Sequence, residues 1–302
     1  MSPPAAGDWK QQQERSNLPL LKLMVWLSLT FGRALGRLVL HGIAAYFTLF
    51  SPRARAASRL YLGRVLGRRP GWRDCYRHVF SFASTIHDRI YLLNGQFERF
   101  DITVHGADAL RAALARQPGA LLIGAHLGSF EVLRAMGRDQ AGLRVSMLMY
   151  EENARKINAT LAAINPRSTA DILPLGQLDS MLAARDRLDQ GHLVGMLADR
   201  SLGPDPTLAV DFLGQPAGFP LGPFRVAAML GRPVFFMTGL YLGGRRYQLH
   251  FEPLADFTGI TRSGREAAIA AAIQAYARCL EKYCRQAPYN WFNFFDFWQT
   301  HA

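Results

Sequence analysis

Residues 120–131 read ALLIGAHLGSFE, and this stretch decides the fold class. Its first half, Ala120–Ala125, is a continuous apolar run, which is typical of a strand buried on both faces. His126 and small residues follow the run, and the composition through Glu131 predicts a turn into a helix. A buried strand that turns into a helix is the repeating unit of a parallel sheet covered by helices.

The same alternation continues along the rest of the chain. Further strands are expected at Ile102–His105, Val145–Tyr150, Ile172–Leu175, Leu193–Leu197, Val234–Leu242 and Tyr247–Phe251. Helices are expected at Val132–Met136, Ala154–Ile164 and Leu178–Leu188, and along the stripe Ile269, Ile273, Tyr276 and Leu280. Residues 100–302 are therefore predicted to form one α/β domain with a mostly parallel sheet flanked by helices.

The N-terminal part of the sequence does not show this alternation of strands and helices. Residues 1–17 form a polar tail, and residues 18–99 are predicted to be a helical, membrane-anchoring region. The apolar stretch Leu18–Phe50 contains Arg33 and Arg37, and each charge costs about 2.5–3.5 kcal/mol at mid-membrane. We therefore expect helices that lie in or dip into the membrane interface, with an ordinary buried helix as the alternative.

The charge of the chain predicts anionic partners. The formal net charge is +12, and only four of the 35 cationic residues are lysine. Arginine binds phosphates and carboxylates through two hydrogen bonds, and seven arginines follow the apolar stretch between residues 53 and 73. Nucleic acid is disfavoured because no zinc finger, basic zipper or RNP signature is present. Three irregularly spaced cysteines predict neither a disulfide framework nor a metal site.

His126 is the leading candidate for chemistry, because ligands bind at the carboxyl ends of strands in such sheets. Glu131, five residues on, is expected to bond one imidazole nitrogen and leave the other as a general base. Backbone N–H groups near Gly128 are expected to meet a phosphate or an oxyanion. Ser129 is expected to cap the helix rather than act as a nucleophile. A purely structural histidine is the alternative.

Two further groups are candidates for substrate contact. Asp199 and Arg200 follow a strand, so Arg200 is placed to hold a phosphate or headgroup; a structural Asp–Arg pair is the alternative. Residues Gly214–Gly222, with Phe219 and Pro220, are expected to form a shaped loop that lines a substrate channel. An ordinary hairpin turn is the alternative for that segment.

The setting GAHLGSFE at residues 124–131 resembles the His-x4-acid motif of the lysophospholipid acyltransferase superfamily, in the form found in bacterial lipid A late acyltransferases. Similar stretches are Gly191–Arg200, Val210–Pro223, Gly231–Val234 and the aromatic tail Pro288–Trp298, which is expected to close the core rather than contact lipid. Arg200 stands where the lipid A enzymes have Gln, and Asp296 lies where they have a basic residue. Both departures resemble a sub-branch found with aryl-polyene gene clusters. The Glu-Gly-Thr-Arg block of the glycerol-phosphate branch is absent.

The resemblance implies a glycerolipid acyltransferase-like fold and an acyltransferase on the cytoplasmic face of a bacterial inner membrane. The donor would be an acyl thioester of acyl carrier protein or coenzyme A, and the acceptor a hydroxyl of a membrane lipid or lipid-like molecule. His126 would deprotonate that hydroxyl, Glu131 would orient His126, and Gly128 or Arg200 would stabilise the oxyanion. No cofactor, metal or nucleic acid is expected. The alternative is a non-catalytic, membrane-bound protein of the same fold that binds lipid or acyl carrier protein.

Overall fold

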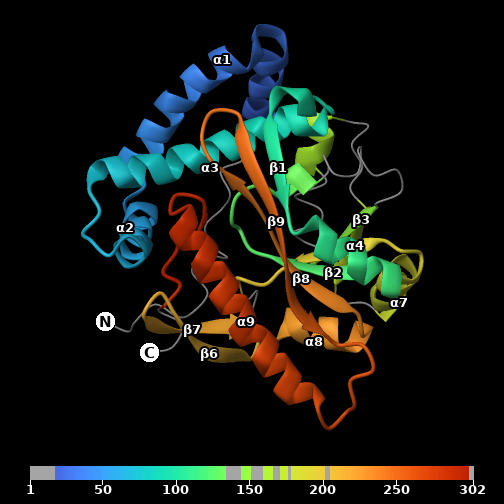
Figure 1. Ribbon diagram of the computed structural model, residues 1–302. Coiled ribbons are helices and arrows are strands. Elements are labelled where there is room, and N and C mark those ends of the chain that lie inside the picture. The colour runs from blue at the N-terminus through green and yellow to red at the C-terminus, as the bar shows by residue number, and fades with distance from the viewer. Residues whose placement is uncertain are drawn as a thin grey trace.

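The fold is built around a seven-stranded sheet (Figure 1). The computed structural model describes residues 18–133, 144–150, 159–165, 171–175, 178–200 and 205–298. The strand order is β1-β9-β8-β2-β5-β3-β4, and every neighbouring pair is parallel except β8–β9. The strands are β1 (Asp101–His105), β2 (Ala120–Gly124), β3 (Val145–Tyr150), β4 (Asp171–Leu175), β5 (Leu193–Leu197), β8 (Pro233–Tyr241) and β9 (Arg246–Asp256). The predicted α/β class with a mostly parallel sheet is confirmed.

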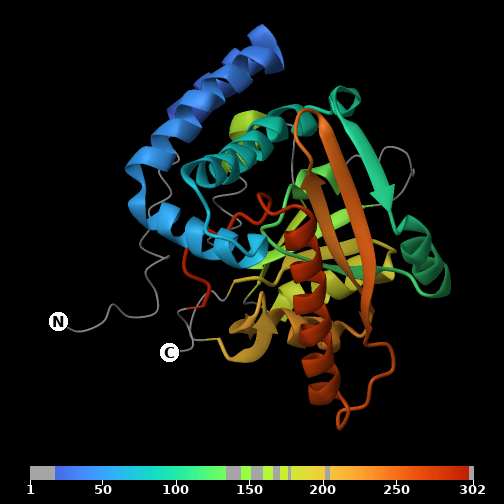
Figure 2. The same ribbon diagram turned by 60° about the vertical axis from the view of Figure 1, so that its left-hand side comes forward.

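Helices cover both faces of this sheet (Figure 2). They are α1 (Leu18–Phe50), α2 (Pro52–Leu66), α3 (Trp72–Leu93), α4 (Ala107–Arg116), α7 (Leu178–Asp189), α8 (Gly222–Leu230) and α9 (Arg265–Gln286), with 3-10 turns η1 (Phe97–Arg99) and η2 (Phe130–Val132). In β2, Leu121 and Ile123 pack in one core with α2, α7, α8 and α9. Ala120 and Leu122 pack in a second core with α1, α3 and α4. The central strand is therefore buried on both faces, as its unbroken apolar run predicts.

The shaped loop expected at Gly214–Gly222 is wrong and the alternative, a hairpin turn, is confirmed, because these residues form a hairpin and the start of a helix. Strands β6 (Thr207–Phe212) and β7 (Gln215–Pro220) pair antiparallel across a tight turn. Phe219 is 0% exposed and packs edge-to-face against other core rings. Buried residues alternate with more exposed ones along part of β7, and two residues connect it to β6. Both features are typical of a hairpin and not of a loop that lines a channel.

The other predicted elements match the structure where it describes them. Each expected strand is present within one residue at its start, except that β9 continues to Asp256. The helix expected at Val132–Met136 begins as the short turn η2, and its end lies outside the described residues. Of the helix expected at Ala154–Ile164, residues 159–164 are described and helical. The polar tail at residues 1–17 lies outside the described residues.

The N-terminal region consists of the three helices α1, α2 and α3. Within α1, Lys22–Phe50 is long and apolar enough to cross a membrane, with a mean hydropathy of 1.4. This helix lies along the outside of α3 (Figure 1). The membrane-anchoring role of residues 18–99 stays a prediction.

Candidate active site

His126 and Asp199 lie at the carboxyl ends of two adjacent parallel strands. Strand β2 pairs with β5 so that Gly124 lies opposite Leu197. Because His126 and Asp199 each follow those residues by two positions, the register places their side chains side by side. The imidazole Nδ1 is 2.9 Å from Asp199 Oδ1.

Three N–H groups converge on the Asp199 carboxylate. Besides the imidazole, the backbone N–H of His126 and the indole N–H of Trp291 each donate to Oδ2 at 3.0 Å. Burial alone would raise the pKa of this fully buried carboxyl group. The His126 and Trp291 hydrogen bonds, with the nearby Arg200 charge, outweigh burial and hold its pKa well below the ordinary value. Asp199 is therefore a fixed anion that accepts the Nδ1 proton.

The His126 ring is held neutral and is reached from outside. Burial lowers its pKa below the ordinary value, and the Arg200 charge adds to this, while Asp199 opposes it. The side chain is 35% exposed. With the proton on Nδ1, as Asp199 requires, the Nε2 lone pair has no hydrogen-bond partner among the described residues. This arrangement is that of a general base.

The structure corrects the predicted role of Glu131. Its Oε1 lies 2.7 Å from Arg89 Nε of α3, and its Oε2 accepts a hydrogen bond from the Ser129 hydroxyl at 3.2 Å. No hydrogen bond joins Glu131 to His126 in the described part of the chain. The reason is the turn after β2, which carries Glu131 toward α3, whereas the sheet register brings Asp199 to the imidazole.

The backbone N–H groups expected to bind an anion are already occupied. Gly128 N–H donates to Asn290 O at 2.9 Å, and Ser129 N–H donates to Gly239 O at 2.8 Å. Gly128 has φ +73°, and a Cβ there would lie 2.0 Å from the Gly239 oxygen, so the close approach of β8 requires glycine. Ser129 precedes η2 but makes no side-chain cap bond, which corrects the predicted cap. These groups fix the turn to the rest of the fold.

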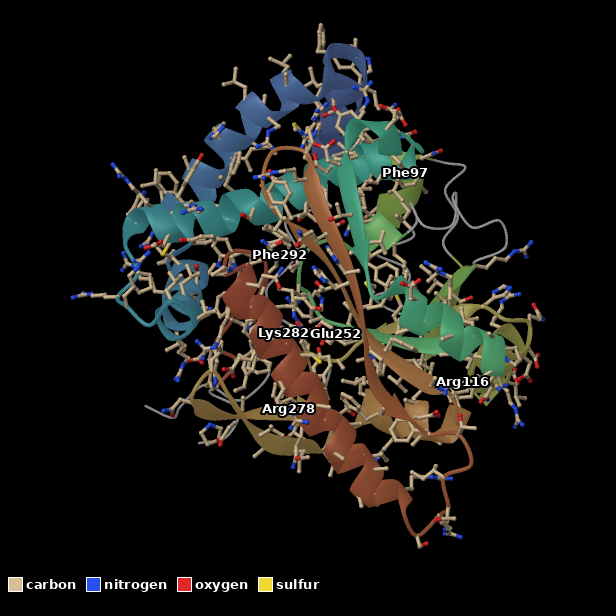
Figure 3. The ribbon with its side chains drawn as sticks, in the orientation of Figure 1. Phe97, Arg116, Glu252, Arg278, Lys282 and Phe292 are labelled. Carbon is tan, nitrogen blue, oxygen red and sulfur yellow. The ribbon has the colours of Figure 1, made fainter. Side chains whose placement is uncertain are left out.

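Arg200 joins the site to the aromatic tail. Its Nη2 donates to Phe292 O at 2.9 Å, and its guanidinium lies 5.3 Å from the centre of the Phe295 ring. Phe292, labelled in Figure 3, donates its backbone N–H to His126 O at 2.8 Å. Trp291 is 0% exposed, so at this residue the tail closes the core. The sequence analysis did not predict that the tail also makes hydrogen bonds to His126, Asp199 and Arg200.

The sequence contained a signal for the His126–Asp199 pair. Both residues follow a buried apolar run by the same short interval, and adjacent buried strands end level with one another. Phe219 and Pro220, predicted to contact substrate, are buried in the hairpin. Among the described residues, no group of three or more His, Cys, Asp or Glu is placed to hold a metal ion.

The fold and site define an α/β protein with a buried carboxylate behind an accessible, neutral imidazole. A family model of bacterial lipid A biosynthesis acyltransferases matches residues 20–300, and the chain belongs to this family. It is also 26% identical over 202 residues to the phosphatidylinositol mannoside acyltransferases of Mycobacterium tuberculosis strains H37Rv and CDC 1551. Each match covers 66% of this chain and 59% of the mycobacterial protein.

Proposed function

We propose that this protein transfers a fatty acyl group from a thioester to a hydroxyl of a membrane lipid or lipid-like acceptor. The observation that carries the proposal is the accessible Nε2 of a neutral His126, whose Nδ1 proton is held by Asp199. The family match and the mycobacterial relatives, which are named phosphatidylinositol mannoside acyltransferases, support the reaction class.

In the proposed reaction, His126 Nε2 takes the proton of the acceptor hydroxyl as its oxygen attacks the thioester carbonyl. The carbon–sulfur bond breaks when the tetrahedral intermediate collapses, and the imidazolium returns the proton to the leaving thiolate. The products are an ester and a free thiol. Asp199 stabilises the imidazolium that forms between these steps, because its carboxylate already accepts the Nδ1 proton.

Arg200 is the proposed group for the oxyanion. The backbone N–H groups of Gly128 and Ser129 are each used within the fold. Arg200 bonds Phe292 O through Nη2, and its positive charge is close enough to His126 to add to the lowering of the His126 pKa by burial. A cation at this place also lowers the energy of the developing negative charge in a water-poor site.

The donor and the location complete the proposal. The donor is an acyl thioester of acyl carrier protein or coenzyme A, and the net charge of +12 favours either anionic partner. The protein acts at the cytoplasmic face of a bacterial inner membrane, where the apolar α1 provides membrane contact. The departures at Arg200 and Asp296 favour an acceptor other than lipid A itself.

Lipid mass spectrometry tests the proposal in the bacterium that encodes this chain. A strain lacking the protein is expected to lose an acylated lipid or lipid-like species, and the wild-type chain to restore it. His126→Ala, produced at the same level and with the same melting temperature, is expected not to restore it. Full restoration by His126→Ala would support the alternative of a non-catalytic binding protein.

A further inference from the structure

Helix α1 has an apolar side that no other described residue covers. Its exposed apolar side chains, 39–67% accessible, are Leu23, Trp26, Leu29, Phe31, Leu35, Leu38, Val39, Tyr46, Phe47, Leu49 and Phe50. They occur along almost the whole helix, which Figures 1 and 2 show on the outside of α3. An apolar surface of this extent marks a contact with a membrane or another molecule.

A break in α1 argues against a transmembrane helix. Gly32 has φ +83° and ψ 172°, so α1 consists of two helical halves, residues 18–31 and 33–50. A membrane span needs about 20 consecutive helical residues. Residues 18–31 are too few, and residues 33–50 reach the lower limit only by including Arg37, whose guanidinium bonds the Tyr241 hydroxyl. Within hydrocarbon, backbone groups freed at the break would have no water to bond.

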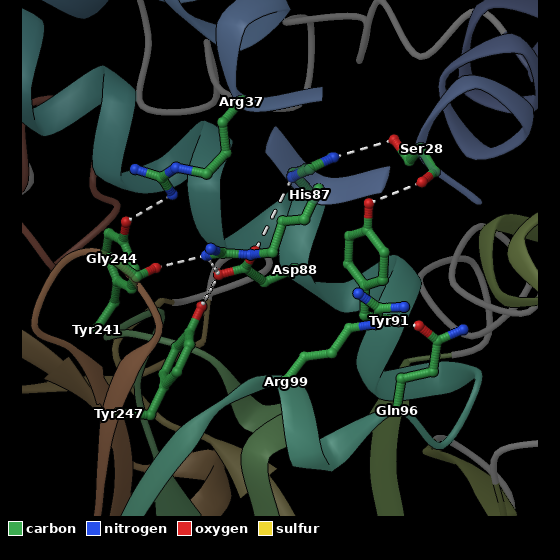
Figure 4. A network of polar contacts seen from close by, with 11 residues as sticks. Ser28, Arg37, His87, Asp88, Tyr91, Gln96, Arg99, Tyr241, Gly244 and Tyr247 are labelled. Atoms are coloured by element: carbon green, nitrogen blue, oxygen red, sulfur yellow. Dashed lines mark hydrogen bonds and ion pairs between the residues drawn. The ribbon is translucent and has the colours of Figure 1, made fainter. Parts of the chain in front are cut away.

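A buried polar cluster holds α1 on α3, at the middle of the apolar stretch. Arg33 Nε and Nη2 donate to the two carboxylate oxygens of Asp88 at 2.7 and 2.8 Å, and the Tyr247 hydroxyl donates to the same carboxylate at 2.8 Å. Ser28 Oγ lies 2.9 Å from His87 Nε2 (Figure 4). The Asp88 side chain is 0% exposed and that of Arg33 12%. We call these five residues the α1–α3 polar cluster.

This cluster does not fit a helix that crosses a bilayer. With α1 docked as in the structure, Asp88 of α3 and the β8–β9 turn would have to enter hydrocarbon together with Arg33. With α1 detached, Asp88 would lose its cationic partner, and Arg33 would have to enter hydrocarbon without its carboxylate, which is strongly unfavourable. An in-plane α1 keeps the ion pair intact and still buries its exposed apolar side.

The cluster region is also connected to the candidate active site. Arg37 of α1 donates to the Tyr241 hydroxyl at 2.9 Å, next to the cluster (Figure 4). The Tyr241 backbone exchanges hydrogen bonds with the Asn290 side chain, and Asn290 O accepts from Gly128 N–H. Helix α1 is thus fixed to the strand and turn that position His126.

Exposed arginines lie on the segment that directly follows α1 in the sequence. Arg59, Arg69 and Arg73, on α2 and around the turn into α3, are exposed, and no acidic side chain pairs with them in the described part of the chain. Arg59 and Arg69 line a common hollow. Apolar side chains beside unpaired arginines are complementary to a bilayer with anionic headgroups.

We propose that α1 lies in the plane of an anionic bilayer surface, with its exposed apolar side in the lipid and its other side held on α3 by the α1–α3 polar cluster. This inference rests on the membrane contact in the proposed function and goes further, because it fixes the helix as interfacial rather than transmembrane. The occupant of the apolar side is phospholipid.

Depth-dependent quenching tests this orientation on the full chain. Leu29→Cys, Leu38→Cys and Phe47→Cys, each labelled with a fluorophore, sample both halves of α1 in a Cys279→Ser background. Cys75 and Cys284 are buried and need no replacement. The vesicles contain phosphatidylglycerol and phosphatidylethanolamine, with a nitroxide either at the headgroup or deep in the acyl chain. Leu182→Cys on α7 is a matched control, because it is also an exposed leucine.

The in-plane geometry predicts that the headgroup nitroxide quenches all three α1 positions more strongly than the deep nitroxide, with no quenching at position 182. A transmembrane helix predicts the strongest deep quenching at position 38 and weaker deep quenching at 29 and 47; that result would overturn the inference. Absence of vesicle binding would also overturn it. His126-dependent thiol release from an acyl thioester would remain measurable in either case, so the two proposals fail separately.

The polar cluster has its own test by hydrogen exchange. Asp88→Asn removes the charge opposite Arg33, and we expect the amides of residues 33–50 to exchange roughly a hundredfold faster, because a buried ion pair is broken. Arg33→Met combined with Asp88→Leu and Tyr247→Phe replaces both charges and the hydroxyl that donates to Asp88 by apolar groups, and should restore slow exchange. Unchanged exchange in folded Asp88→Asn, or fast exchange in the folded triple variant, would overturn the role of the cluster.

Discussion

Replacing Asp199 by Asn separates the role of its charge from its shape. The carboxylate accepts from the imidazole through Oδ1 and from the His126 backbone and Trp291 indole through Oδ2. An amide has only one acceptor oxygen. If that oxygen takes the Oδ2 position, it serves two donors, and the amide NH2 then faces His126 Nδ1. The imidazole would have to accept at Nδ1 and carry its proton on Nε2, the tautomer that cannot act as the base.

We expect Asp199→Asn to lower kcat by about 10²–10⁴-fold, the usual effect of losing a general base, or about 3–5 kcal/mol of activation free energy. Loss of the negative charge also removes the interaction that raises the His126 pKa. The acid limb of the residual kcat/KM profile should therefore move to lower pH. In the His126→Ala background the Asn substitution should add little, because the two residues act together.

The assay is thiol release from an acyl thioester in the presence of membrane lipid, followed from pH 4 to 9. Asp211→Asn is the matched control, because this carboxylate is exposed on the β6–β7 hairpin. An Asp199→Asn protein that folds normally and keeps wild-type kcat, or whose acid limb moves to higher pH, would show that the Asp199 charge does not act on His126 in this way.

Three further predictions concern Arg200, Gly128 and His78. Arg200→Ala should move the acid limb of kcat/KM to higher pH, opposite to Asp199→Asn, because the guanidinium lowers the His126 pKa; an unmoved limb would contradict this. Gly128→Ala and Gly191→Ala both place alanine at positive φ, which should lower the free energy of unfolding by about 1–2 kcal/mol in each variant. Only the Cβ at position 128 would meet a backbone oxygen, so only Gly128→Ala should also abolish thiol release. Burial lowers the pKa of His78 in the folded protein to about 4. As the pH falls from 6.5 to 4, the unfolded chain therefore binds a proton at His78 before the folded protein does, and the free energy of unfolding should fall by about 3 kcal/mol. Melting temperatures of His78→Gln should fall less steeply over that range, and an identical slope would argue against it.

The sequence alone predicts the sheet because its evidence is local. The runs around Leu121 and Val194 are continuous and apolar, and such runs are buried on both faces in parallel sheets. The turn after β2 was also predictable from its small residues. The sequence left two alternatives for Gly214–Gly222, a shaped loop and a hairpin turn, because its glycines and prolines match either one, and the structure shows the hairpin.

The sequence predicted His126 as a site residue but did not predict which residues bond it. His126 stands out because it ends a buried run, but its partner depends on strand order, which brings β5 beside β2 across more than seventy residues of chain. Glu131 is the nearer acid in sequence, yet α3 supplies Arg89 as its partner. The involvement of Trp291 depends on where the tail returns, and no local pattern encodes that contact.

Acyl transfer by His126 and Asp199 is tested by thiol release from one acyl thioester, measured in parallel for purified wild type, His126→Ala and Asp199→Asn with the same lipid extract. We expect release and a matching amount of new lipid ester for the wild type, and a loss of about 10²–10⁴-fold for each variant. Equal ester formation by wild type and folded His126→Ala would contradict it.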